Sequence, residues 1–241
     1  MKRRAKAGSR RPRERGRTVA AVTDSIRITS PTFPRTVLDR ILRETRPFTD
    51  VGHYLYPADA NGNHTKGFFA IEPVTKVAGF VDAIADDVVT WADRESVDVD
   101  FVFAPAQPAV RPLAERVATR LEKPVAFWEY LPSGRYGDHL VDGSVPGGSM
   151  ALALNGVSLQ GRCVGFRLPQ FVESLGGTVV AAAVFAKGVA DLVRQTEERL
   201  GDQFYSTLQV NVPVFPASEC PVCISTQAVP VSWRLFAEAP R

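Results

Sequence analysis

Apolar residues recur along most of the chain with one of two periods. Within "KVAGFVDAIADDVVTWAD" they fall every three or four positions, which predicts a helix packed on a core through Val77, Phe80, Val81, Ile84, Val88 and Trp91. The same period predicts helices near residues 33–45, 110–121 and 189–201, and near 168–177, where a glycine pair is suited to a C-cap. Pro34 fits the first turn of the earliest of these helices.

Short, nearly continuous apolar runs lie between the helical segments. "DFVFAPA", "KPVAFWEY", "MALAL" and "TVVAAAVFA" have the composition of strands buried on both faces, and "STLQVNVPVF" alternates as an edge strand does. Strands that alternate with helices of this length form βαβ units. The pattern therefore predicts an α/β fold with a central, mainly parallel β-sheet flanked by helices.

Ligands of such sheets bind beyond the carboxyl ends of the strands. Three segments fall there: "APAQPAV" (104–110), "EYLPSGRYGDHLVDGSVPGG" (129–148) and "NGVSLQGRC" (155–163). We expect these loops to form the ligand site, if the protein has one.

Charge is unevenly distributed along the 241 residues. Residues 1–17 carry nine Lys or Arg and one Glu, so the net charge of +3 leaves −5 for residues 18–241. This composition predicts a disordered basic tail at 1–26, followed by one domain at 27–241 without an internal repeat or linker. Through residues 1–17 the tail could bind nucleic acid or an acidic partner; the alternatives are a solvated extension or a start codon placed too early.

Other properties bound the cellular setting. The longest apolar run, "VVAAAVFA", is too short to cross a bilayer, and the N-terminus lacks the apolar centre of a secretory signal. Three cysteines do not suggest a disulfide framework. We expect a cytoplasmic protein without a membrane partner.

Several motifs, in one order, resemble those of orotate phosphoribosyltransferases. They are "VGHYLYPADANGNHTKGFF", "DFVFAPAQPAVRPLAERVATRLEKPVAF", "VPGGSMALALNGVSLQGRC" and "ASECPVCISTQAVP", and the match covers about residues 48–232. The resemblance implies a type I phosphoribosyltransferase-like fold with a small hood region, and a dimer. It also implies displacement of pyrophosphate from phosphoribosyl pyrophosphate (PRPP) by a nucleobase, with magnesium as the cofactor of an active enzyme.

The motif positions that handle PRPP in that family are altered here. The paired acids fall on Asn155 and Gly156, and in the 5′-phosphate cradle at 159–163 only Gly161 fits the pattern. The leucine at the start of that cradle removes a hydroxyl donor and is expected to intrude on the phosphate position. Pro169 predicts that the next helix starts near Leu168, after a longer and differently shaped loop.

The pyrophosphate turn and the hood differ as well. The turn falls on Gln107, Pro108 and Ala109, and proline there has no N–H to donate. The hood segment at 129–143 offers only Arg135 and His139 as cations. We therefore assign no catalytic residue. The ligand-binding candidates of this degenerate site are Asn155, Gly156, Gly161, Arg162, Gln107, Lys66, Arg135 and His139.

Some of these residues have ordinary structural interpretations. "NG" at 155–156 is typical of a tight turn. His53 and His64 are interpreted as structural, because no third metal ligand is in view. Cys220 and Cys223 supply half of a zinc site, which two chains could complete across a dimer interface, or they are two semi-buried thiols in a turn. Trp128 is packing, or an aromatic floor for a base.

Three functions remain open. The leading hypothesis is a catalytically impaired member of the orotate phosphoribosyltransferase group, acting as a nucleotide- or anion-binding or regulatory protein, with no cofactor assigned. The second is an active transferase with a rearranged site, in which Arg135, Arg162 and Lys66 converge on one pocket. The third is a structural subunit, paired with an intact homologue rather than with itself.

Overall fold

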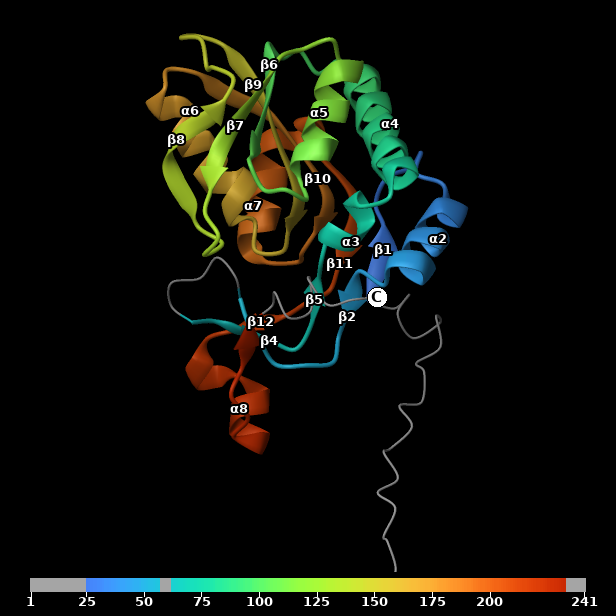
Figure 1. Cartoon of the computed structure of the whole chain (residues 1–241), viewed down its shortest axis with the longest axis vertical. Helices are drawn as coiled ribbons and strands as arrows, with labels where there is room; N and C mark the ends of the chain where they lie inside the picture. The colour runs from blue at the N-terminus through green and yellow to red at the C-terminus, as the bar shows by residue number, and fades with distance from the viewer. Residues whose placement is uncertain (1–24, 57–61, 233–241) are drawn as a thin grey trace, which may run out of the picture.

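The computed structural model describes residues 25–56 and 62–232, so residues 1–24 of the predicted tail at 1–26, with its charged part at 1–17, lie outside the described residues. The first strand begins at Ile26, inside the predicted tail. A seven-stranded sheet forms the centre of the molecule (Figure 1). Its strands run in the order β1 (Ile26–Ile28), β11 (Phe204–Val210), β10 (Thr178–Lys187), β9 (Met150–Ser158), β6 (Phe101–Pro105), β7 (Val125–Tyr130) and β8 (Tyr136–Asp142). The five inner strands run parallel to one another, and β1 and β8 pair antiparallel at the two edges. The predicted fold class is confirmed.

Successive strand residues point to opposite sides of the sheet, so the sheet has two apolar faces, and helices cover both of them. Val102 and Ala104 of β6 belong to the larger core, whereas Phe101 and Phe103 face the smaller one. The larger core is covered by α2 (Arg35–Thr45), α3 (Glu72–Thr75), α4 (Ala78–Arg94) and α5 (Arg111–Arg120). The smaller core is covered by the π-helical turn η1 (Cys163–Arg167) and α6 (Leu168–Ser174), with α7 (Asp191–Leu200) beside η1.

Short strands form two further sheets on one side of the central sheet (Figure 1). β2 (Phe48–Thr49) pairs with β5 (Phe68–Phe69). The other sheet has the order β12 (Val214–Phe215), β4 (His64–Thr65), β3 (Tyr54–Leu55) and β13 (Val231–Ser232). The chain between β12 and β13 forms the 3-10 turn η3 (Ala217–Glu219) and helix α8 (Pro221–Thr226), and a second such turn, η2 (Gly201–Gln203), precedes β11. The C-terminal segment is thus paired to a hairpin from the first third of the chain.

Three local expectations differ from the structure. Asn155 and Gly156 are not a tight turn: β9 continues through them to Ser158, because β10 pairs with it along that length. β11 is not an edge strand, since β1 pairs with its outer side. The segment 129–148 is not one long loop, because β8 folds back on β7 as a hairpin.

The loop between the cradle and α6 is also shorter than expected. Helix α6 begins at Leu168, as Pro169 predicts. The preceding residues Cys163–Arg167 form the π-helical turn, so the chain reaches the helix through helical backbone and not through a longer loop. Among the described residues, no helix is long and apolar enough to cross a membrane.

Candidate anion-binding site

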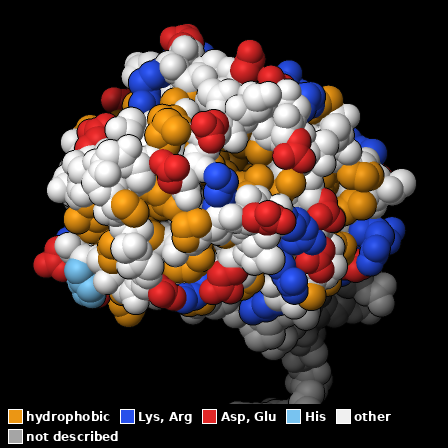
Figure 2. Space-filling view, turned by 90° about the horizontal axis from the view of Figure 1, so that it is seen from above, with side chains coloured by type: hydrophobic (Ala, Val, Ile, Leu, Met, Phe, Trp, Pro, Cys, Tyr) orange, Lys and Arg blue, Asp and Glu red, His pale blue; other side chains and the backbone are white. Residues whose placement is uncertain are grey.

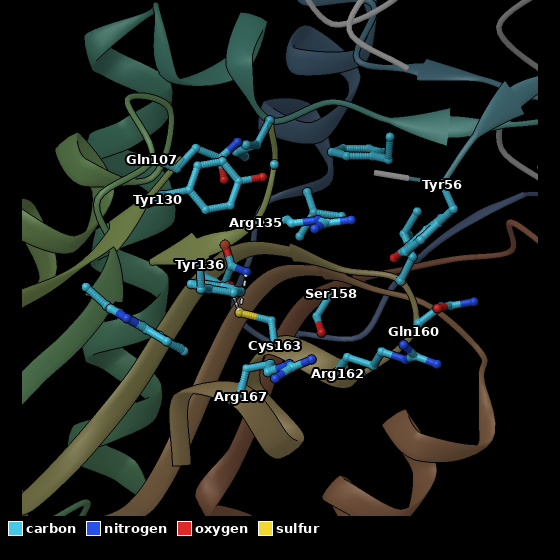
Figure 3. A pocket seen from close by; sticks show the side chains of 18 of the residues that line it. Tyr56, Gln107, Tyr130, Arg135, Tyr136, Ser158, Gln160, Arg162, Cys163 and Arg167 are labelled. Carbon is cyan, nitrogen blue, oxygen red and sulfur yellow. Dashed lines mark hydrogen bonds between the residues drawn. The ribbon is translucent and has the colours of Figure 1, made fainter. Parts of the chain in front are cut away.

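A cavity of about 390 Å³ lies beyond the carboxyl ends of β6, β7 and β9, where the three loop segments meet (Figure 3). The β9–η1 segment and the β7–β8 hairpin form two of its walls. Tyr56, Phe68 and Phe69 come from the small sheets, and Gln107 follows β6. The cavity therefore occupies the place at which open parallel sheets bind their ligands.

Three arginines line this cavity, one from the β7–β8 hairpin and two from the two ends of η1. Arg135 lies in the turn of the β7–β8 hairpin, Arg162 precedes η1, and Arg167 ends it (Figure 3). None of the three forms a salt bridge with an acid among the residues described here. Glu72 is the one acidic residue in the described lining, and its Oε1 accepts a hydrogen bond from Gln107 Nε2 at 3.0 Å. The lining consequently favours an anion.

On the face seen from above in Figure 2, acidic and basic side chains are interspersed. A broad basic surface of the kind that binds nucleic acid is not seen on that face.

The end of β9 is held by hydrogen bonds within the protein. Asn155 is 7% exposed, and its Nδ2 donates to Cys163 Sγ at 2.8 Å while its Oδ1 accepts from the Gly156 N–H at 2.7 Å. At Gly156 a Cβ atom would lie only 2.8 Å from Cγ1 of Ile71. A pair of acids at 155–156 would therefore lose the first contact and collide with Ile71 at the second position.

Cys163 also contacts the hairpin, since its Sγ lies 2.6 Å from the hydroxyl oxygen of Tyr136. Burial raises the pKa of the Cys163 thiol to about 11 and raises the pKa of Tyr136 well above its usual value. Both groups are thus protonated at neutral pH. A protonated thiol is a poor nucleophile, so Cys163 acts here as a structural contact.

The cradle segment retains unused hydrogen-bonding capacity. Ser158 Oγ and Gln160 Oε1 are buried and have no hydrogen-bond partner among the described residues. Buried polar atoms in folded proteins are normally satisfied, so the two atoms suit a polar ligand or water in the cavity. Gly161, which precedes Arg162, adopts φ +77°, and a Cβ there would lie 2.6 Å from Val193 N and 2.8 Å from Leu192 C, so the position requires glycine.

The leucine in the cradle, Leu159, is 3% exposed and packs in the larger core. It contributes to the cavity lining, but its side chain is mainly a core residue. The hydroxyl that the family pattern has at this position is absent, as the sequence indicates.

Trp128 is enclosed by other aromatic rings. Its ring stacks on Tyr136 at a centroid distance of 4.3 Å and on Phe171 at 4.2 Å, and its Nε1 donates to Gly137 O at 3.1 Å. With both ring faces covered, Trp128 holds the β7–β8 hairpin and is not a floor for a base. Tyr56 and Tyr130 are among the aromatic side chains that Figure 3 shows around the upper part of the cavity.

Most, but not all, of the sequence candidates meet at the cavity. Gln107, Arg135, Asn155, Gly161 and Arg162 line it. Three do not belong to its lining: Gly156 faces Ile71, and Lys66 and His139 are exposed elsewhere. His139 lies 3.1 Å from Asp138 and 3.3 Å from Glu129, and its pKa is raised by the hydrogen bond to Asp138 and by the charge of Glu129.

Several lining residues were not among the binding candidates of the sequence, although Gln160 and Cys163 lie in the cradle at 159–163: Tyr56, Tyr130, Tyr136, Ser158, Gln160, Cys163 and Arg167. Their position next to strand ends was the available signal. What the sequence did not reveal is the π-helical turn, which brings Arg167 back to the cavity beside Arg162.

Magnesium is the ion that the family resemblance implies for an active enzyme. Magnesium sites use carboxylates together with substrate phosphates. The described lining offers Glu72 alone, engaged by Gln107, and neither position of the acid pair carries a carboxylate. The residues present therefore do not fit a magnesium ion held by the protein.

The second candidate cluster lies in the small sheet. Cys220 and Cys223 come together with His53 and His64, and the four ligand atoms all lie within 4.8 Å of one another. The interpretation that the histidines have no further ligand nearby is wrong, because pairing of β12 and β13 with the hairpin closes a separation of more than 150 residues.

Comparison with known proteins agrees with the architecture. No family model matches the chain. Among solved structures, the orotate phosphoribosyltransferase of Aeropyrum pernix is similar at 18% identity over 72% of this chain and 92% of that one, with a TM-score of 0.54. That of Mycobacterium tuberculosis H37Rv, in complex with inorganic phosphate, is similar at 15% identity over 72% and 96%, with a TM-score of 0.53.

A third similar structure is the UMP synthase of Leishmania donovani, at 14% identity over 72% of this chain and 36% of that one, with a TM-score of 0.54. The fold of the chain is thus that of the phosphoribosyltransferases. Within that class it is the orotate phosphoribosyltransferase-like fold that the sequence motifs resemble.

Proposed function

We propose that the protein is an orotate phosphoribosyltransferase-like protein that binds a phosphorylated, nucleotide-like anion in the arginine-lined cavity and has lost most or all PRPP chemistry. The observation that carries the proposal is the meeting of Arg135, Arg162 and Arg167 in one cavity at the carboxyl ends of the strands. Guanidinium groups bind phosphate through paired, charge-assisted hydrogen bonds. The role that follows is binding or regulation.

The loss of chemistry is supported by the end of β9. In the family that the motifs resemble, two acids hold the ribose hydroxyls of PRPP. Here Asn155 is committed to Cys163 and to its own backbone neighbour, and Gly156 has no room for a side chain. Pro108 in the pyrophosphate turn has no N–H to offer. A site that positions a sugar through these groups loses several charge-assisted contacts at once.

A calorimetric titration tests this proposal. The full chain is titrated with inorganic phosphate, PRPP with and without magnesium, orotate, and orotidine monophosphate, and Arg162→Ala and Lys66→Ala are titrated beside it. We expect the phosphorylated ligands to bind the native protein and the Lys66 variant, and to bind the Arg162 variant much more weakly. Equal binding by all three proteins, or by none, would reject the cavity as an anion site.

A second candidate function has one observation in its favour. Arg135 and Arg162 converge on the cavity, as a rearranged active site would require, although Lys66 does not join them. An active transferase would form orotidine monophosphate and pyrophosphate from orotate and PRPP. The same titration mixtures, assayed for pyrophosphate, separate the candidates: release that depends on Arg135 and Arg162 favours the transferase, and binding without release favours the impaired protein.

A further inference from the structure

Four side chains with the chemistry of metal ligands meet in the small sheet, away from the anion cavity. His53 directly precedes β3, His64 begins β4, and Cys220 and Cys223 lie at the start of α8. The two halves are joined by backbone pairing of β12 with β4 and of β13 with β3. The Val231 N–H also donates to His53 O at 2.8 Å, so the cluster is closed within one chain.

Four of the six distances between the ligand atoms are close to those of a tetrahedral site. His53 Nε2 lies 3.1 Å from His64 Nδ1, 3.3 Å from Cys220 Sγ and 3.4 Å from Cys223 Sγ, and Cys223 Sγ lies 3.2 Å from His64 Nδ1. Around a tetrahedral zinc ion, with Zn–N of about 2.0 Å and Zn–S of about 2.3 Å, neighbouring ligand atoms are about 3.3 to 3.8 Å apart. Only small movements separate the observed cluster from that arrangement.

The burial of these side chains also supports a metal site. Cys220 is fully buried, and His53 and His64 are 8% and 7% exposed. Yet the segment around them has little apolar core: its strands have two residues each, α8 buries no residue, and Ile224 and Val229 are largely exposed. Small units with too little core to fold by burial alone commonly depend on a bound metal or on disulfides. The three cysteines of this chain are free.

We propose that His53, His64, Cys220 and Cys223 bind one structural zinc ion per chain. Two thiolates and two imidazoles form a ligand set that zinc prefers over magnesium, calcium or manganese. Binding displaces the two thiol protons of the cysteines to solvent and uses the neutral imidazole nitrogens His53 Nε2 and His64 Nδ1. All four positions are filled by protein, which is the mark of a structural site and not a catalytic one.

The site anchors one wall of the anion cavity as well. Tyr56, which lines the cavity, follows β3 directly, and β3 is paired to both β4 and β13. The zinc ion thus fixes the C-terminal segment to the hairpin that carries this tyrosine. Its existence does not depend on the anion cavity being functional.

Metal analysis of the purified full chain tests the proposal. Elemental mass spectrometry is applied to protein made with zinc present and kept reduced, and a cobalt-exchanged sample is examined for the ligand-field and thiolate charge-transfer absorption of a tetrahedral site. Cys220→Ser, Cys223→Ser and His64→Asn are measured in parallel. Cys163→Ser is the matched control, because Cys163 is the remaining cysteine and lies at the anion cavity.

We expect one zinc per chain in the native protein and the Cys163 variant, and loss of that equivalent in each cluster variant. A variant that fails to fold is replaced by a test on native protein: zinc should protect Cys220 and Cys223 from alkylation, a chelator should remove the protection, and Cys163 should be unaffected by either. Half an equivalent per chain, a Cys220–Cys223 disulfide, or alkylation that ignores zinc and chelator would each overturn the proposal.

Discussion

The hydroxyl oxygen of Tyr136 lies 2.6 Å from Sγ of Cys163, and this contact joins the β7–β8 hairpin to the start of η1 across the floor of the anion cavity (Figure 3). Asn155 Nδ2 approaches the same sulfur from β9 at 2.8 Å. Three elements that line the cavity are therefore tied together at one thiol. Burial keeps this thiol protonated by raising its pKa, although the hydrogen bonds to Tyr136 and Asn155 act in the opposite direction.

The pH dependence of stability should reveal the buried thiol. Burial raises the pKa of Cys163 from 9.0 to about 11, so the thiol keeps its proton in the folded protein while the unfolded chain begins to ionise near pH 9. The stabilising effect of this difference is complete below pH 9 and is lost as the pH rises to about 11, at about 1.4 kcal/mol for each unit of pKa difference. Denaturant unfolding of native protein and Cys163→Ala from pH 8 to 11 measures it. The variant should lose less stability over that range, and parallel curves would contradict the assignment.

Each cavity arginine should contribute to phosphate binding. We expect Arg135→Ala, Arg162→Ala and Arg167→Ala each to weaken binding of inorganic phosphate by about 10- to 100-fold, the cost of losing one charge-assisted hydrogen bond. Isothermal titration at low ionic strength gives the affinities, and rising salt should weaken the native protein more than the variants. Lys66→Ala, which removes an exposed cation outside the lining, should change little. A single sensitive arginine would mean that the three do not share one ligand.

The packing of Gly156 against Ile71 should prevent a simple repair of the acid pair. A Cβ at this position would lie 2.8 Å from Cγ1 and 3.0 Å from Cγ2 of Ile71. We expect Gly156→Ala to lower the free energy of unfolding by about 1 to 3 kcal/mol, the usual cost of overpacking.

A double-mutant cycle checks that cause. In an Ile71→Ala background the collision partner is gone, so the cost of Gly156→Ala should fall markedly. Gly147→Ala serves as the control, because a Cβ at Gly147 would meet nothing within 4 Å, and it should change stability by less than about 0.5 kcal/mol. Equal costs in both backgrounds would show that Ile71 is not the obstacle.

The buried carboxylate of Asp87 should make Tyr205 important for stability. Asp87 is 5% exposed and accepts hydrogen bonds from Ser30, Thr32, Tyr205 and Thr207. Tyr205→Phe removes one donor to a charged acceptor, which should lower the free energy of unfolding by about 1.5 to 3 kcal/mol. Thr90 lies on the exposed side of α4, the helix that carries Asp87, so Thr90→Ala should lower the free energy of unfolding much less. Denaturant titration of both variants measures the difference.

The sequence by itself determined the elements and their class. Apolar spacing located the main helices and the inner strands, because a helix and a strand bury faces of different period in any fold. It also located the site in outline, since Gln107, Asn155, Gly161 and Arg162 follow predicted strands and do line the cavity. The altered cradle and acid pair were visible directly as residue types.

The tertiary structure decided what these residues contact. Asn155 and Gly156 have the local pattern of a turn, but pairing with β10 extends the strand through them, and tertiary hydrogen bonding overrides a weak local preference. Arg167 reaches the cavity only because η1 winds the chain back toward it. Likewise, a CxxC pair near the C-terminus gives no indication that two histidines more than 150 residues earlier lie beside it. Contacts of this kind depend on which strands pair, and strand pairing is set by the burial of the whole chain rather than by any local stretch of it.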